Sequence, residues 1–267
     1  MTLPLPVSLT PSKVASFKDC ALAFRFSAID HLPEPPSAAA TKGTLVHRAL
    51  ELLFCEPPAG RTVPTALSCL ATARQELATD PEFVGLELDD EAEGRFVDEA
   101  EALVRRYFEL EDPTSVTPIG LELRLEVAIG TLTLRGVIDR LDRDPDGGLV
   151  VTDYKSGKVP RVMHEQSRLG GVHFYAFLCE QLLGVRPVRI QLLYLSEPVA
   201  IVAQPSEQSV RAMQTRAMAI WKAVETACER DDFRPHPSRL CDWCAFRDYC
   251  PAFGGDPARA RELVVVG

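Results

Sequence analysis

Two apolar segments separated by a tight turn set the strongest constraint on how this chain folds. Residues 132–141 and 149–154 are rich in Leu, Ile and Val, and a Pro-Asp-Gly-Gly sequence lies between them. This pattern predicts two adjacent strands joined as a β-hairpin. Asp139 lies near the end of the first predicted strand, and Asp153 and Lys155 lie at the end of the second. Residues two positions apart on a strand share a face, so Asp153 and Lys155 are expected to lie side by side.

The remaining pattern predicts helices and strands in alternation. Apolar residues at helical spacing indicate helices over residues 11–28, 43–54, 65–79, 89–110, 172–183 and 206–230. Further strands are predicted over residues 120–129, 189–195 and 199–202. This order predicts an α/β protein with a central mixed sheet flanked by helices. We expect a single domain over residues 1–267, with residues 60–115 as a helical insertion.

Composition and charge exclude several classes of protein. The chain has 267 residues, of which 46% are hydrophobic and 25% charged, as in ordinary globular proteins. No apolar run approaches the roughly 20 residues of a membrane span, and the N-terminus lacks the features of a secretion signal. We therefore expect a cytoplasmic protein with no membrane partner. A net charge of -9 argues against non-specific coating of DNA, although local basic patches can still bind it.

The carboxylates at the two strand ends suit metal-dependent chemistry. Phosphodiester hydrolysis needs charge stabilisation at phosphorus and a hydroxide near neutral pH, and Mg²⁺ or Mn²⁺ held by carboxylates supplies both. Asp139 and Asp153 are the candidate ligands, and Lys155 would position or deprotonate the attacking water. Strand alternation turns the Tyr154 ring to the other face, so its backbone carbonyl is the predicted metal contact. The alternative is an ordinary hairpin with charged ends, because Asp-x-Lys triplets are common.

Three further residues are candidates for the same site. His47, on the predicted helix 43–54, offers an imidazole ligand, and a half-buried histidine without such a role is the alternative. Glu51 shares the helical face of His47 and is either an accessory group or a solvated charge. Glu122, on the strand before Asp139, is another accessory candidate, although Glu126 has the same facing.

Three motifs occur in order over residues 43–195: Gly-x-x-x-His ending at His47, Gly-x-Ile-Asp-Arg containing Asp139, and Asp-Tyr-Lys-Ser-Gly beginning at Asp153. They resemble the core motifs of the RecB-like branch of the PD-(D/E)XK nucleases. The resemblance implies a restriction-endonuclease-like core in which His47, Asp139 and Asp153 coordinate the catalytic Mg²⁺ or Mn²⁺. It also implies that Lys155 is the basic residue of the motif and that Glu122 matches the strand glutamate of the family.

One position departs from the pattern of that branch. Its members usually carry a Gln four residues before a Tyr in the helix that follows the Lys strand. Tyr175 matches that Tyr, but Gly171 occupies the Gln position and Gln166 lies too early. The departure implies changed contacts with DNA or water, and leaves room for altered polarity or weakened activity.

Closely spaced cysteines mark the C-terminal region. Eight cysteines in a chain without an export signal do not indicate a disulfide framework. Cys241, Cys244 and Cys250 suit a metal centre, which needs a fourth ligand. By resemblance to iron–sulfur nucleases of the family, Cys20 completes a [4Fe–4S] cluster, with residues 11–28 and 232–255 as its clamp. Structural Zn²⁺, with His236 or Cys20 as fourth ligand, is the alternative.

Together these features predict a metal-dependent DNA exonuclease that acts on single-stranded DNA in repair, recombination or CRISPR-associated processing. Basic residues near the site are candidates for phosphate contacts, with an ordinary solvated surface as the alternative for each: Arg135, Arg140, Arg143, Lys158 and Arg161. No Walker-type sequence occurs, so a helicase would be a separate chain; such a helicase, or CRISPR adaptation proteins, are the expected partners besides DNA. The alternative is a catalytically weak or inactive DNA-binding or scaffold subunit of a helicase–nuclease complex.

Overall fold

The computed structural model describes residues 2–159 and 162–264. The chain divides into two compact units. The first unit comprises Met1–Pro35, Glu126–Gly136 and Arg211–Gly267, and the second comprises Pro36–Leu125 and Val137–Val210. All candidate residues of the carboxylate site lie in the second unit, whereas Cys20 and the three C-terminal cysteines lie in the first. Each site can therefore be described within one unit.

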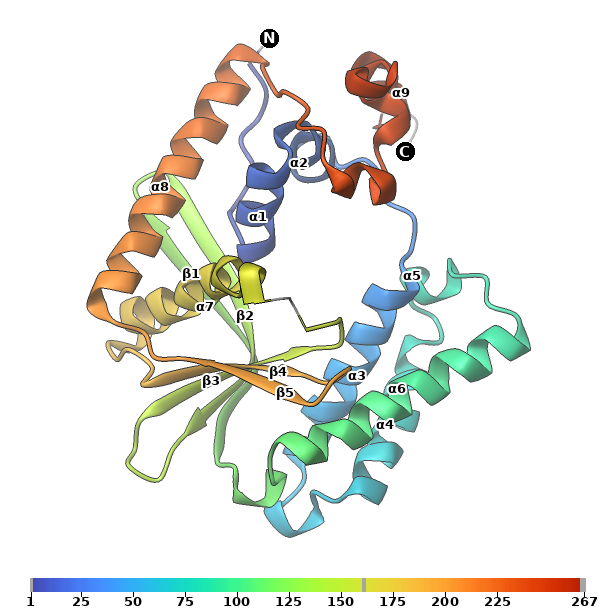
Figure 1. The fold of residues 1–267 in the computed structure, drawn as a ribbon, viewed down its shortest axis with the longest axis vertical. Helices are drawn as coiled ribbons and strands as arrows, with labels where there is room; N and C mark the ends of the chain where they lie inside the picture. The colour runs from blue at the N-terminus through green and yellow to red at the C-terminus, as the bar shows by residue number, and fades with distance from the viewer. Residues whose placement is uncertain (1, 160–161, 265–267) are drawn as a thin grey trace. The chain divides into compact units, whose positions relative to one another are not determined.

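A five-stranded sheet runs in sequence order from β1 to β5 (Figure 1). Its strands are β1 (Pro118–Ile129), β2 (Leu132–Arg143), β3 (Leu149–Lys155), β4 (Arg189–Tyr194) and β5 (Val199–Ala203). β3 pairs antiparallel with β2 and parallel with β4, and β4 pairs antiparallel with β5. The helix α7 (Val162–Leu183) makes the crossover that the parallel pair requires. This mixed sheet with its flanking helices confirms the predicted α/β fold class.

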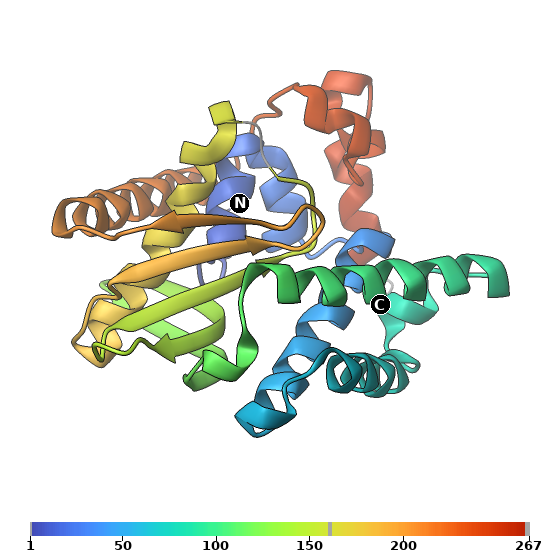
Figure 2. The same ribbon diagram turned by 60° about the horizontal axis from the view of Figure 1, so that its bottom comes forward.

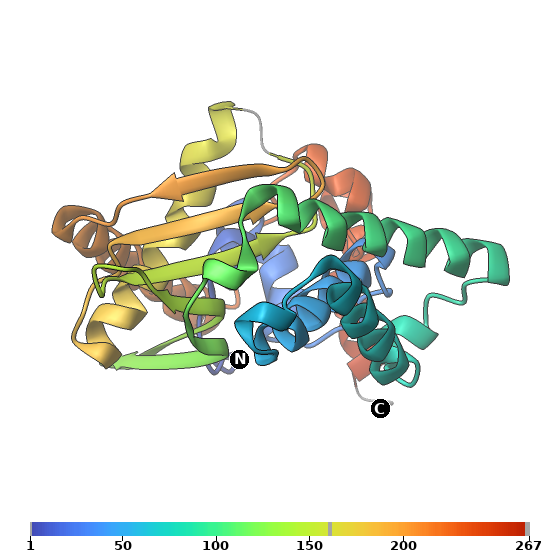
Figure 3. The same ribbon diagram turned by 90° about the horizontal axis from the view of Figure 1, so that it is seen from below.

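Three helices of the second unit lie side by side in all three views (Figures 1, 2 and 3). They are α3 (Ala38–Cys55), α4 (Val63–Leu77) and α6 (Asp90–Leu110), with the short α5 (Pro81–Val84) between the last two in sequence. Their buried side chains form one core with Tyr154 and Leu193 of the sheet. These helices therefore cover the sheet face that carries Tyr154. Asp153, the neighbour of Tyr154 on β3, points to the opposite face because side chains alternate along a strand.

Helix α7 starts ten residues before the predicted helix 172–183. Gly170 and Gly171 lie inside it. Glycine lowers helix propensity by about 1 kcal/mol relative to alanine, so the sequence pattern does not indicate a helix there. Burial of Phe174, Phe177 and Leu178 on the following turns supports the helix through packing.

The first unit contains α1 (Pro11–Asp19), α2 (Ala21–Ala28), α9 (Pro257–Val264) and α8 (Glu207–Arg230) from Arg211 onward. The prediction of one helix over residues 11–28 is wrong, because Cys20 is extended (φ -160°, ψ 112°) and separates α1 from α2. Buried Arg25 on α2 pairs with Asp30 at 3.0 Å and with Asp231, just after α8, at 2.7 Å. This ion-pair network joins the N-terminal helices to the C-terminal segment. Within the described parts of the chain, no helix is long and apolar enough to cross a membrane.

Candidate metal centre

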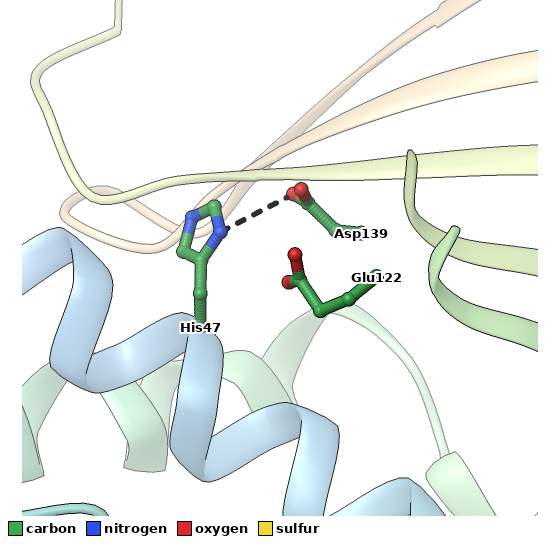
Figure 4. Close-up of side chains that lie close together, drawn as sticks. All are labelled: His47, Glu122 and Asp139. Atoms are coloured by element: carbon green, nitrogen blue, oxygen red, sulfur yellow. Dashed lines mark ion pairs between the residues drawn. The ribbon is translucent and has the colours of Figure 1, made fainter. Parts of the chain in front are cut away.

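Three side chains from three elements meet at one end of the sheet. His47 comes from α3, Glu122 from β1 and Asp139 from β2 (Figure 4). Each offers one ligand atom, and these atoms all lie within 4.8 Å of one another. His47 Nδ1 lies 3.5 Å from Asp139 Oδ2. One imidazole and two carboxylates at this spacing form a donor set that can hold a divalent cation.

The main chain of Tyr154 connects two of these residues. Its N–H donates a hydrogen bond to Asp139 Oδ2 at 2.6 Å, and its carbonyl oxygen lies 3.0 Å from His47 Nε2. Its ring is directed elsewhere, because the hydroxyl accepts a hydrogen bond from Arg140 Nη1 at 2.7 Å. The carbonyl of Tyr154, and not its ring, therefore lies beside His47 and Asp139.

Asp153 and Lys155 form an ion pair next to this group. Asp153 is only 4% exposed, and its Oδ2 lies 2.5 Å from Lys155 Nζ. Apart from this ion pair, that oxygen accepts no hydrogen bond from any described residue. Because Asp153 Oδ2 is turned toward Lys155, it does not belong to the tight group of His47, Glu122 and Asp139. The Lys155 ammonium compensates this buried carboxylate, so a metal ion that binds Asp153 would take the place of Lys155 beside it.

Burial and repulsion between carboxylates raise the pKa values of the acids in this region. Burial raises the pKa of Asp153 to about 6, with the charge of Lys155 opposing the rise and that of Asp139 adding to it. Burial and the charge of Asp139 raise the pKa of Glu122. Burial by itself lowers the pKa of His47, but the hydrogen bond and charge of Asp139 raise it overall. A divalent cation would relieve this repulsion and displace the His47 proton, so the residues fit a metal ion.

Comparison with known proteins identifies the family. The model of the PD-(D/E)XK nuclease superfamily matches residues 8–251. This chain belongs to the PD-(D/E)XK nuclease superfamily. The matched residues of this PD-(D/E)XK nuclease include Asp139, Asp153 and Lys155.

A solved structure shows the same fold at low sequence identity. A protein from Eubacterium rectale named "Putative exonuclease" superposes with a TM-score of 0.57 and 10% identity, over 89% of this chain and 87% of that one. The structure of SSO0001 matches with a TM-score of 0.36 and 14% identity, over 76% of this chain and 84% of that chain. None of the curated proteins matches the sequence.

Glu122 is the member of the group that the strand pattern did not distinguish from Glu126. Its backbone has φ +44°, a left-handed conformation rare for residues other than glycine. Such a residue interrupts the alternation from which facing is predicted, and the strain of about 1–3 kcal/mol is typically found at functional sites. Glu126 forms an ion pair with Arg135, and both side chains are about half exposed. Strand alternation did not separate the two glutamates, and only the resemblance to the family favoured Glu122.

The remaining candidate positions of this nuclease are Tyr175, Glu51 and Gly171. Tyr175 is close enough to the site that, after burial, the charges of Asp153 and Asp139 contribute to raising its pKa. Glu51 pairs with Arg48 at 2.7 Å and lies outside the tight group of ligand atoms. Gly171, which replaces the usual Gln, is half-buried.

One of the residues predicted to contact phosphates cannot do so. Arg140 is fully buried, so that prediction is wrong. It directly follows Asp139 on β2, and alternation turns it to the face covered by α3, α4 and α6. Arg135, Arg143 and Lys158 are exposed, and Arg161 lies outside the described residues.

The four cysteines predicted to form a cluster lie near one another in the first unit. Burial raises the pKa of Cys244, and the charges of Cys20, Cys241 and Cys250 add to the rise. Cys20 Sγ accepts the His236 N–H at 3.4 Å, and Cys241 Sγ accepts a backbone N–H at 3.3 Å. Among the described residues, no three of these sulfurs lie within 4.8 Å of one another. The four thiols are therefore neighbours, but no three of them are as close together as the ligand atoms of His47, Glu122 and Asp139.

Gly43 keeps α3 close to the strand that carries the candidate site. A Cβ atom at this position would lie 3.0 Å from the hydroxyl of Ser156, which follows Lys155. We expect Gly43→Ala to lower nuclease activity by a few fold and Gly43→Val by tenfold or more, because the added atoms displace His47 from Asp139. The matched controls are Gly94→Ala and Gly94→Val on α6, where a Cβ meets nothing within 4 Å. Equal activity of the two valine variants in a DNA hydrolysis assay would contradict this account.

Proposed function

We propose that this protein is a Mg²⁺- or Mn²⁺-dependent exonuclease that hydrolyses single-stranded DNA. The observation that carries the proposal is the convergence of His47, Asp139 and the Tyr154 carbonyl beside the Asp153–Lys155 ion pair. Membership of a nuclease superfamily supports hydrolysis of a nucleic acid. The name of the Eubacterium rectale protein supports the exonuclease assignment by analogy of fold.

Some of these residues would bind the metal ion, and others would act on the substrate and the attacking water. His47, Asp139, Asp153 and the Tyr154 carbonyl would hold the cation, with Glu122 as an additional carboxylate. When bound, the cation supplies positive charge for the phosphate and lowers the pKa of a water molecule. Lys155, whose side chain is 34% exposed, would orient the attacking water and offset phosphate charge once Asp153 turns from it to the cation. Tyr175 would offer its hydroxyl to the substrate, because its raised pKa keeps it a donor.

Mn²⁺ is expected to stabilise the wild-type protein against heat. A ligand present at about 100 times its Kd adds ~2.7 kcal/mol of stability, which for a chain of this size is a Tm increase on the order of 5–10 °C. Asp139→Asn should abolish the increase, because it removes a charged ligand. Asp146→Asn, the same change in the exposed turn between β2 and β3, should leave it intact. A Tm increase that survives Asp139→Asn would place the ion elsewhere.

Lys155→Ala is expected to lower kcat on labelled single-stranded DNA by about 10²- to 10⁴-fold, the usual contribution of a group that assists proton transfer. The Mn²⁺-induced Tm increase should persist, because Lys155 does not bind the ion. Lys158→Ala provides the comparison, since this exposed lysine would act through phosphate binding and change KM by less than about tenfold. Loss of the Tm increase in Lys155→Ala would instead indicate a role in building the metal site.

A catalytically weak DNA-binding subunit of a helicase–nuclease complex is the second candidate function. It is favoured by Gly171, which offers no side chain where the RecB-like branch has a Gln. In that case wild-type protein binds DNA but degrades it no faster than Lys155→Ala does. Under the first proposal, repair, recombination or CRISPR-associated processing would supply the DNA end, with a helicase or adaptation protein as a separate partner.

We further propose that Cys20, Cys241, Cys244 and Cys250 hold a [4Fe–4S] cluster. The charges of Cys20, Cys241 and Cys250 act on the pKa of Cys244, which supports a shared centre for the four sulfurs. The resemblance to the iron–sulfur nucleases of the family favours a cluster over a single Zn²⁺ ion. Contacts of Phe26 with Phe246 and Tyr249 hold the C-terminal segment against α2 independently of the cluster.

Protein purified without oxygen is therefore expected to be brown, with about four iron atoms and four sulfides per chain. Cys20→Ser should lose the colour and most of the iron. Cys55→Ser, which alters an exposed cysteine, should retain both. Colourless protein that contains stoichiometric zinc would overturn the cluster assignment.

A further inference from the structure

A fully buried arginine lies behind the candidate metal centre. Arg140 directly follows Asp139 on β2, but its side chain points to the opposite face of the sheet. The guanidinium has hydrogen-bond partners from several elements: Asp142 at 2.8 and 3.0 Å, the Tyr154 hydroxyl at 2.7 Å, Thr152 at 3.2 Å, Tyr107 at 3.3 Å and Glu111. This number of contacts is unusual for a single side chain and links the elements from which they come.

The Arg140 guanidinium contacts elements that also carry the candidate site. Tyr154 and Thr152 lie on β3, which ends in Asp153 and Lys155. Phe54 lies on α3, the helix of His47, and its ring centre is 4.3 Å from the guanidinium carbon. Each of these elements would therefore shift if the arginine moved.

Arg140 and Thr152 form the first paired position of the β2–β3 ladder next to the site. Their side chains are hydrogen-bonded to each other, and the Thr152 hydroxyl donates to Asp142 at 3.2 Å. Immediately beyond this pair, the Tyr154 N–H donates a hydrogen bond to the Asp139 carboxylate. A slip of the ladder by one residue would turn Asp139 to the face covered by α3, α4 and α6. It would also leave the charged Arg140 guanidinium without its hydrogen-bond partners.

We infer that Arg140 is a positioning residue for the metal centre. It fixes the register of β2 against β3 and positions α3 through its contact with Phe54. It also holds the Tyr154 ring, so that the Tyr154 main chain lies against Asp139 and His47. It touches neither substrate nor metal. The inference rests on the proposed metal-binding role of the site.

Two tyrosine variants separate positioning from general support of the fold. Tyr154→Phe removes a hydroxyl that contacts Arg140 from the strand of the site. Tyr107→Phe makes the same chemical change at a buried tyrosine of α6, whose main chain contacts neither Asp139 nor His47. We expect Tyr154→Phe to weaken Mn²⁺ binding about tenfold and to lower kcat with KM within twofold. Tyr107→Phe should leave the Kd for Mn²⁺ within twofold of wild type, even if both variants lose thermal stability.

Amide exchange at residue 154, measured without metal, tests the same inference independently. Tyr154→Phe should increase this exchange rate at least fivefold, because its N–H bond to Asp139 loosens, whereas Tyr107→Phe should not. Equal Kd values and equal exchange rates in the two variants would overturn the positioning role. If wild-type protein binds no Mn²⁺ at all, the proposed function fails, and the exchange rates alone then decide whether Arg140 positions Tyr154. Arg140→Lys, which keeps the charge but loses the planar fork, should resemble Tyr154→Phe and not wild type.

Discussion

The hydrogen bond from the Tyr154 main chain to the Asp139 carboxylate is the contact on which the geometry of this site depends. It lies just beyond the last paired position of the ladder between β2 and β3, and it couples a side chain on one strand to the backbone of the other. The carbonyl of the same residue lies beside His47 Nε2, which brings α3 into the arrangement. One residue thus sets the relative positions of groups from two strands and a helix. Its own position is set from the opposite face, where the ring meets Arg140.

The two faces of the sheet differ in whether their buried charges are balanced by neighbouring side chains of opposite charge. On the Arg140 face, buried charges are paired with one another, so they require no external ion. On the Asp139 face, carboxylates outnumber cations, and burial together with mutual repulsion raises the pKa values of Asp153 and Glu122. An excess of buried negative charge is costly unless a cation offsets it. The fold therefore supplies a reason for a divalent ion that does not depend on family membership.

Local periodicity was sufficient to predict some of these features and insufficient for others. The side-by-side placement of Asp153 and Lys155 and the turn of the Tyr154 ring away from the site follow from strand alternation. The same rule applied to Arg140 places it on the buried face, so the expectation of phosphate contact contradicted a signal already present in the sequence.

The grouping of His47 and Glu122 with Asp139 depends on contacts between distant segments and, for Glu122, on a left-handed backbone that no pattern indicates. Cys20 likewise interrupts a helix that apolar spacing predicted to be continuous. Its extended backbone places Sγ next to the backbone of the C-terminal segment, where it accepts the His236 N–H. These features are tertiary, and local propensity does not encode them.

A crystal structure of the protein soaked in Mn²⁺, with anomalous scattering recorded at the manganese edge, tests the central claim most directly. The account predicts an anomalous peak bound by Asp139, Asp153, His47 and the Tyr154 carbonyl, with the Asp153 carboxylate released from Lys155 to reach the ion. A structure without a peak at these residues, or with Asp153 still paired to Lys155 beside an ion bound elsewhere, would contradict it.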